Sequence, residues 1–235
     1  MSDNLFTMDQ EVEKQVEKDV LGGFAARESA LYPMTIKTAF LGDYAGGSKY
    51  VSIVLEDDQG NYSEEECVWS IKTKGPTYID KKTGKTKELI GFAKINSLAK
   101  LLTGKGLEQS VFETKVHEVY SKDAGAKVPT PLPTLTEWTG KVVHVGILKT
   151  VENKQTKSGD KYVATAETRE VNSVDKWFNE DKKTLVEVEK GVEAKFYEQW
   201  EKANTDRVID KTDKTLKAGP VGGTGAATAE PLKFD

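Results

Sequence analysis

Two lysine-rich segments carry the side chains best suited to bind a polyanion. They span residues 81–87 and 153–161, and each lies between strand-like apolar runs. We therefore expect their ammonium groups to project from hairpin tips, where they could contact nucleic-acid phosphates. With the neighbouring loop lysines, the candidate phosphate contacts are Lys72, Lys74, Lys81, Lys82, Lys85, Lys87, Lys154, Lys157 and Lys161.

A purely solubilising role is the alternative for either tip taken alone, because lysine is common on exposed turns. Two such tips with few acids favour a binding function. Neither tip contains arginine, and arginine is the side chain that reads guanine edges with two hydrogen bonds. The pattern thus predicts a grip on the backbone that is indifferent to sequence.

Tyrosines near the predicted tips could stack on unpaired bases, and each stacked base contributes about 1 to 3 kcal/mol. Tyr44 lies in a predicted turn, Tyr50 begins a strand, and Tyr78 and Tyr162 flank the two basic tips. We interpret the other large aromatic side chains as core, since they are in phase with aliphatic neighbours. These are Trp69, Phe92, Trp138, Phe196 and Trp200.

The composition limits any nucleic-acid site to part of the surface. The 235 residues are 37% hydrophobic and carry a formal net charge of −4, which excludes a protein that neutralises nucleic acid with its whole surface. The single cysteine, Cys67, permits no disulfide within the chain and is expected to face the core. With no long apolar run, we expect a soluble cytoplasmic protein without membrane contact.

Enzymatic and metal sites find little support in the sequence. The segment 83–86 resembles the end of a phosphate-binding loop, but Ile79 stands where its first glycine is needed. The consecutive residues Glu64, Glu65 and Glu66 alternate between strand faces and cannot converge on one ion. We expect no catalytic residue, no metal and no cofactor.

Hydrophobic periodicity predicts strands joined by short turns. The expected strands are 34–41, 49–55, 62–71, 141–152 and 161–170, with a short strand at 115–120 and an inserted hairpin over 77–90. In the third strand, Cys67, Trp69 and Ile71 form the expected inward row. The alternating prolines 129, 131 and 133 predict an irregular surface connection.

Helices are expected at 8–20, 92–102 and 192–202. Three strands, a helix and two strands is the element order of an OB-fold, a five-stranded Greek-key barrel that is partly open. We therefore expect a mainly β fold with an inserted hairpin and flanking helices. Its segments are an N-terminal helical segment (1–30), the nucleic-acid-binding domain (31–204) and a flexible tail (205–235).

The layout of residues 32–204, together with the Gly/Ala-rich tail, resembles the single-stranded DNA-binding proteins of bacteriophages. The resemblance implies a non-enzymatic protein that coats and protects single-stranded DNA during replication, recombination or repair, in the host cytoplasm. It also implies that the tail docks replication proteins, here through Leu232 and Phe234. Lys233 departs from the acidic tail tip of that family. The alternative is a non-catalytic adaptor whose terminal segments bind proteins.

Overall fold

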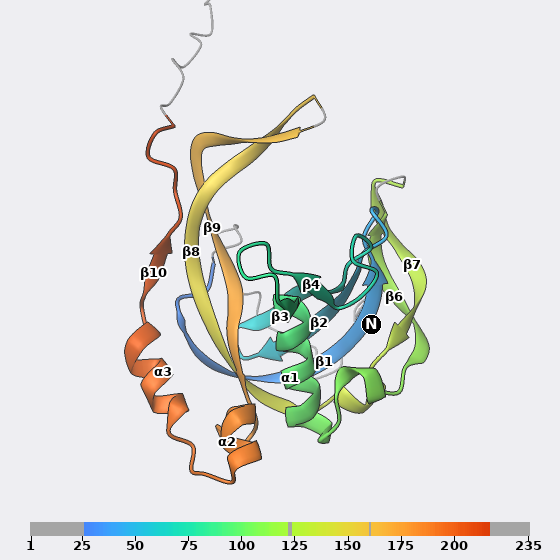
Figure 1. The fold of residues 1–235 in the computed structure, drawn as a ribbon, viewed down its shortest axis with the longest axis vertical. Helices are drawn as coiled ribbons and strands as arrows, with labels where there is room; N and C mark the ends of the chain where they lie inside the picture. Colours follow the sequence, from blue (N-terminus) through green and yellow to red (C-terminus); the bar gives the residue numbers. More distant parts are fainter. Residues whose placement is uncertain (1–25, 122–123, 160, 217–235) are drawn as a thin grey trace, which may run out of the picture.

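The computed structural model describes residues 26–121, 124–159 and 161–216 and is mainly β, as expected (Figure 1). The strands are β1 (Ala30–Asp43), β2 (Lys49–Asp57), β3 (Gly60–Trp69), β4 (Thr77–Ile79), β5 (Thr86–Glu88), β6 (Glu113–Ser121), β7 (Ala126–Thr134), β8 (Val142–Ser158), β9 (Lys161–Phe178) and β10 (Val208–Asp210). The helices are α1 (Ile90–Thr103), α2 (Leu185–Lys190) and α3 (Phe196–Asn204). Short 3₁₀ turns lie at Leu107–Gln109 and Thr136–Trp138.

Strand β1 joins the two halves of a strongly curved sheet. Its first residues pair with β8 and its later residues with β2, with an irregularity between Ile36 and Thr38 where it changes partner. The resulting order is β9-β8-β1-β2-β3, with every neighbour antiparallel. A bulge of this kind increases twist and lets one strand serve two sheets.

No ladder of backbone bonds joins β3 to β9 among the described residues, so the sheet is open between these strands. Side chains bridge the opening instead. Val174 donates its backbone N–H to the Glu64 carboxylate at 3.2 Å. Lys94 of α1 donates to the Val174 carbonyl at 2.7 Å and pairs with Glu66 at 2.5 Å. Helix α1 thus closes one end of the curved sheet.

The core follows the alternation that the sequence predicts for β1, β2 and β8. The inward rows are fully buried beneath one face of α1, which contributes Ile95 and Leu98. Gly104 ends this helix in the left-handed conformation, and its N–H donates to the Lys100 carbonyl, as expected of a C-terminal glycine. The inward strand residues are Met34, Ile36, Val51, Ile53, Leu55, Val143, Val145 and Ile147.

The expected inward row of β3 is wrong by one residue. Tyr62 and Val68 are buried, whereas Ile71 is 46% exposed. The inward row includes Glu64 and Glu66, whose carboxylates accept hydrogen bonds from Tyr62, Val174 and Lys94. Hydrophobic periodicity does not reveal two acidic residues in an inward row. A shift of the assignment by one residue exchanges the two faces of the strand.

The prediction of an irregular connection at 129–133 is also wrong. Strand β7 pairs with β6 along its whole length, with Pro129 opposite Glu118 and Pro131 opposite Val116. Residues two apart in a strand direct their backbone N–H groups to the same edge, so these prolines all lack an N–H group on one edge of β7. The ladder to β6 therefore remains complete, and the outer edge of β7 is poor in donors.

The C-terminal half adds elements to the outside of β8. Trp200 of α3 packs over Gly146 and donates its indole N–H to Asp175 at 2.7 Å, while Phe196, expected in the core, is 39% exposed. Strand β10 pairs in parallel with β8. Residues 205–216 of the expected tail thus include a paired strand. Of the helices that the structure describes, none has the length and apolarity to cross a membrane.

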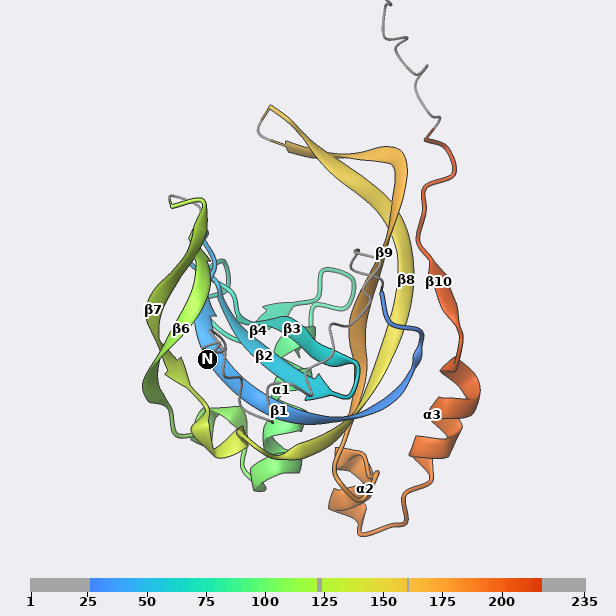
Figure 2. The same cartoon turned by 180° about the vertical axis from the view of Figure 1, so that it is seen from behind.

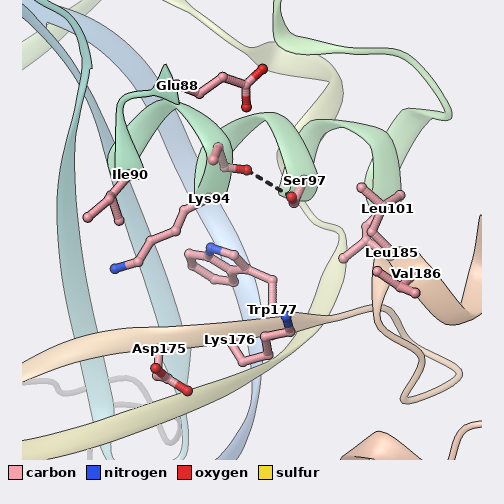
Figure 3. Close-up of a pocket in the computed structure, with 11 residues that line it drawn as sticks. Glu88, Ile90, Lys94, Ser97, Leu101, Asp175, Lys176, Trp177, Leu185 and Val186 are labelled. Atoms are coloured by element: carbon pink, nitrogen blue, oxygen red, sulfur yellow. Dashed lines mark hydrogen bonds between the residues drawn. The ribbon is translucent and has the colours of Figure 1, made fainter. Parts of the chain in front are cut away.

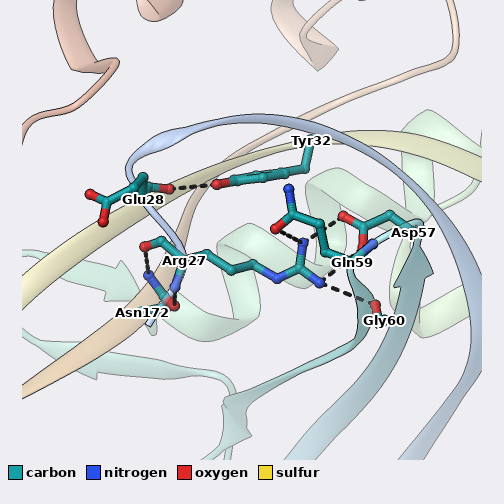
Figure 4. Close-up of polar contacts among 7 residues, drawn as sticks. All are labelled: Arg27, Glu28, Tyr32, Asp57, Gln59, Gly60 and Asn172. Atoms are coloured by element: carbon teal, nitrogen blue, oxygen red, sulfur yellow. Dashed lines mark hydrogen bonds and ion pairs between the residues drawn. The ribbon is translucent and has the colours of Figure 1, made fainter. Parts of the chain in front are cut away.

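The segment before β1 is fixed to the body by Arg27 (Figure 4). Its side chain pairs with Asp57 and donates to the Gly60 carbonyl, and its backbone exchanges two hydrogen bonds with the Asn172 side chain. These contacts join the β2–β3 turn to β9. These contacts are made by a residue that precedes the expected boundary at residue 30.

Candidate nucleic-acid interface

Three hairpins rise from the same side of the curved sheet (Figures 1 and 2). They are the β4–β5, β6–β7 and β8–β9 hairpins. The β4–β5 hairpin lies between the two longer ones, and the distal part of β8–β9 bends across the open side. Both lysine-rich segments lie on these hairpins, as the sequence predicts.

The first lysine-rich tip is the turn between β4 and β5. Asp80 organises it by accepting the backbone N–H groups of Lys82 and Gly84, at 2.8 and 2.7 Å. Lys87 pairs with the Asp80 carboxylate, and this contact lowers the pKa of Asp80. Tyr78 lies opposite Lys87 and is half-buried. The remaining lysines of the tip, all exposed, are Lys81, Lys82 and Lys85.

Lys72 and Lys74 are exposed on the loop that precedes β4. A bridge between Ser70 and Gly75 closes this loop, and the N–H of Ile71 donates to the Ser48 hydroxyl at 3.2 Å. The loop is thereby held beside the β1–β2 turn. Sequence spacing alone does not predict this contact between the two loops.

The second lysine-rich tip is the distal part of the β8–β9 hairpin. Lys157 lies opposite Tyr162, whose ring is 70% exposed. The pairing register shifts between Asn153 and Gln155, and such an irregularity bends a strand pair. Lys154 pairs with Glu167 at 3.1 Å, with both side chains more than half exposed. Lys161 is exposed at the start of β9.

An aromatic pocket of about 370 Å³ lies between the outer face of β1–β3 and the β6–β7 hairpin. The register places Phe40 beside Ser52 and Ser52 beside Glu65, so these three side chains share that outer face. Tyr44 and Tyr50 lie at one end, with ring centroids 4.7 Å apart. The pocket is lined by Phe40, Asp43, Tyr44, Ala45, Tyr50, Ser52, Glu65, Glu118, Val119 and Tyr120.

The structure changes the expected role of Tyr50. It is only 8% exposed, and the end of its ring lies over Gly42. Little of the ring is therefore open for a base to stack on. Tyr120, which is 65% exposed and lines the pocket, was missed because the sequence does not show that its short strand pairs with the proline-rich segment. Phe40 was missed because the bulge in β1 turns it away from the core row.

Carboxylates give this pocket a polar lining. Burial raises the pKa of Tyr44, and the nearby Glu65 carboxylate raises it further. Burial also raises the pKa of Tyr50, with smaller contributions from Glu65 and Asp43. Both hydroxyls are therefore protonated near neutral pH and can donate. Asp43 pairs with Lys49 at 2.6 Å.

The two histidines lie in separate places. His117 stacks on Phe40, with centroids 4.3 Å apart, and bonds Thr134 through Nε2 at 2.7 Å. His144 bonds the Tyr197 hydroxyl at 3.1 Å. Burial lowers the pKa of each. Across the described ranges, no three His, Cys, Asp or Glu side chains gather in a metal-binding group.

The expected partner-binding residues Leu232 and Phe234 lie outside the described residues, as does the expected helix at 8–20. No family model, curated protein or solved structure matches the chain.

Proposed function

We propose that this protein binds single-stranded DNA without strong sequence preference. The observation that carries the proposal is that both lysine-rich tips lie on hairpins that rise from one side of the curved sheet, together with a third hairpin whose residues 118–120 line an aromatic pocket. Ammonium groups follow a phosphate backbone at any sequence, while exposed rings such as Tyr120 and Tyr162 accept any unpaired base. The absence of arginine from both tips agrees with contacts that do not read base edges in a duplex.

The strand pairing supports an OB-type barrel as the scaffold. In that fold the first strand pairs with both the second and the fourth, and the helix lies between the third and fourth strands along the chain. Here β1 pairs with β2 and β8, and α1 follows β3. The β4–β5 and β6–β7 hairpins are then insertions on either side of α1. The outer face of β2 and β3 is the surface on which such folds bind oligonucleotides.

A role in coating DNA during phage replication, recombination or repair follows from the resemblance in layout, and it is part of the proposal. The host cytoplasm is the corresponding location. Leu232 and Phe234 are the residues proposed to recruit replication proteins. Such a role needs no catalytic group.

An apolar groove favours a second candidate, a protein-interaction adaptor. The groove has a volume of about 490 Å³ and lies between α1, β9 and α2. Figure 3 shows Leu101, Leu185 and Val186 grouped at one side of Trp177, with Ile90 at the other. Ile90 is 72% exposed and Val186 is 52% exposed. An apolar patch of this kind is common at protein interfaces.

A titration with labelled oligonucleotides tests the proposed function and separates the two candidates. The full chain is mixed with a single strand or a duplex of equal length, over a range of salt concentrations. We expect the single strand to bind much more tightly and the logarithm of its affinity to fall linearly with the logarithm of salt. Equal affinity for duplex would exclude the stacking pocket. No binding at low salt would favour the adaptor.

A further inference from the structure

The carboxylates of the aromatic pocket have no role in a site that only grips phosphates. Glu65 and Glu118 both line the pocket, and no ion pair joins either to a basic side chain within the part of the chain that the structure describes. Two such charges repel a phosphate placed between them. In a bound strand, the phosphates must therefore follow the lysines, and the pocket must face the bases.

The pocket also contains hydroxyl groups that can donate hydrogen bonds. Tyr50 lines the pocket, and its hydroxyl can donate a hydrogen bond there. Tyr44 and Glu65 line the same pocket. Ser52, between Phe40 and Glu65 in the register, adds a second hydroxyl. The lining thus combines a surplus of acceptors with a small number of donors, between aromatic rings.

This arrangement matches the edge of a nucleobase. Cytosine presents an exocyclic amino group as a donor, beside acceptors that a tyrosine hydroxyl can satisfy. Thymine presents a carbonyl oxygen at the position of that amino group. Opposite two carboxylates, the two N–H bonds of the amino group can both form charge-assisted hydrogen bonds. Thymine offers only its N3–H and places a carbonyl oxygen against the second carboxylate.

We infer that the aromatic pocket holds one base of the bound strand and prefers a base with an exocyclic amino group, so that cytosine binds better than thymine. The inference rests on the proposed single-stranded DNA binding and names the ligand of its pocket. Glu65 and Glu118 accept from the amino group, the Tyr50 hydroxyl donates to the base, and Tyr44 and Tyr120 contact the ring. A bias at one position is compatible with coating a strand of any sequence.

Fluorescence anisotropy of the full chain tests this inference with oligo-dC and oligo-dT of about 15 nucleotides, a length suited to one barrel. Both are pyrimidine strands of equal charge, so the phosphate contribution is matched. An oligo-deoxyuridine strand controls for the thymine methyl group. We expect oligo-dC to bind about fivefold to tenfold more tightly than oligo-dT, and oligo-deoxyuridine to bind like oligo-dT.

Variants then assign the preference to the pocket. The double variant Glu65→Gln with Glu118→Gln should bring the affinity ratio of the two strands close to one, because glutamine can donate to the thymine carbonyl. Tyr50→Phe removes only the hydroxyl and should also reduce the ratio. The matched control is Glu189→Gln with Glu198→Gln, which makes the same charge change on α2 and α3 and should leave the ratio unchanged.

The outcomes distinguish this inference from the proposal on which it rests. If the parent binds oligo-dC and oligo-dT equally, the inference is overturned while single-stranded DNA binding stands. If the ratio favours oligo-dC but is the same in both pocket variants, the preference arises elsewhere and the inference is again overturned. If neither strand binds at low salt, the proposed function itself is overturned.

Discussion

The guanidinium of Arg27 holds the carboxylate of Asp57 through both of its terminal nitrogens, at 2.5 and 2.9 Å (Figure 4). The two side chains are only 11% and 6% exposed. Arg27 also lies over the rings of Tyr32 and Tyr62. This pair connects the segment before β1 to the β2–β3 turn, beside the opening between β3 and β9.

Removing Arg27 should destabilise the fold because it leaves the Asp57 carboxylate buried without its partner. We expect Arg27→Ala to lower the free energy of unfolding by about 3 kcal/mol, measured by urea denaturation. Arg27→Lys is the matched control. It keeps the charge but not the two-pronged geometry, so it should recover only part of the loss. Full stability of Arg27→Ala would show that the pair is not important for folding.

Gly91 allows α1 to approach β3 closely. A Cβ atom at this position would lie 2.4 Å from the Cys67 carbonyl oxygen and 2.9 Å from the Cys67 nitrogen. Alanine favours a helix by about 1 kcal/mol over glycine, but backbone atoms cannot move aside cheaply. We expect Gly91→Ala to lower the free energy of unfolding by about 2 kcal/mol.

Gly46→Ala is the control for this substitution, because a Cβ there meets no atom within 4 Å. Thermal unfolding of the two variants compares the same chemical change in a tight and an open place. A more stable Gly91→Ala variant would show that helix propensity outweighs the contact with β3.

Glu187 joins α2 to the start of α3. Its carboxylate accepts from the backbone and hydroxyl of Thr184, and from the backbone N–H groups of Lys195 and Phe196 at 2.8 and 2.7 Å. Burial by itself would raise the pKa of Glu187. The hydrogen bonds from Thr184, Phe196 and Lys195 outweigh that effect, so the pKa is lower than in the unfolded chain.

A carboxylate whose pKa is lowered by folding stabilises the protein above its unfolded pKa, and this contribution is lost as the pH falls through the folded pKa. We expect Glu187→Gln to lower the free energy of unfolding at pH 7 by about 1 to 2 kcal/mol. The difference from the parent should shrink as the pH falls below the unfolded value of 4.5. Urea denaturation over this pH range measures it. A difference that is independent of pH would contradict the assignment.

Sequence periodicity predicted the strands whose inward rows are wholly apolar. The rows through Val51 and Val143 were assigned correctly because alternation reports burial directly. The row through Glu64 was not, since its carboxylate is satisfied by Tyr62 and by Val174, which is 110 residues away in the chain. Only the folded structure brings such a donor close.

The candidate site was predictable where it depends on local sequence. The lysine-rich tips lie on hairpins because apolar strands flank them, and this signal is present in any short window. The aromatic pocket depends on the register Phe40–Ser52–Glu65 and on a hairpin that brings Tyr120 to it. Neither the bulge in β1 nor the pairing of a proline-rich strand can be read from periodicity.

The lysine-rich tips provide the most direct test of the proposed interface. We expect replacement of Lys81, Lys82, Lys85 and Lys87 by alanine to weaken binding of single-stranded DNA, and the same for Lys154, Lys157 and Lys161. Each phosphate contact that is lost should reduce the salt slope by about 0.7. Lys87 and Lys154 also pair with Asp80 and Glu167, so they should contribute less than the other lysines.

The control for these variants removes Lys190, Lys195 and Lys202, three exposed lysines of the α2–α3 region. It makes a similar change in net charge away from the hairpins, so it separates local phosphate contacts from the overall charge of the protein. We expect its affinity and salt slope to stay close to those of the parent, in titrations at several salt concentrations. If the hairpin variants and this control lose affinity equally, the lysines act only through net charge. If the hairpin variants bind like the parent at every salt concentration, the lysines of the tips serve only solubility, and the DNA phosphates contact another part of the protein.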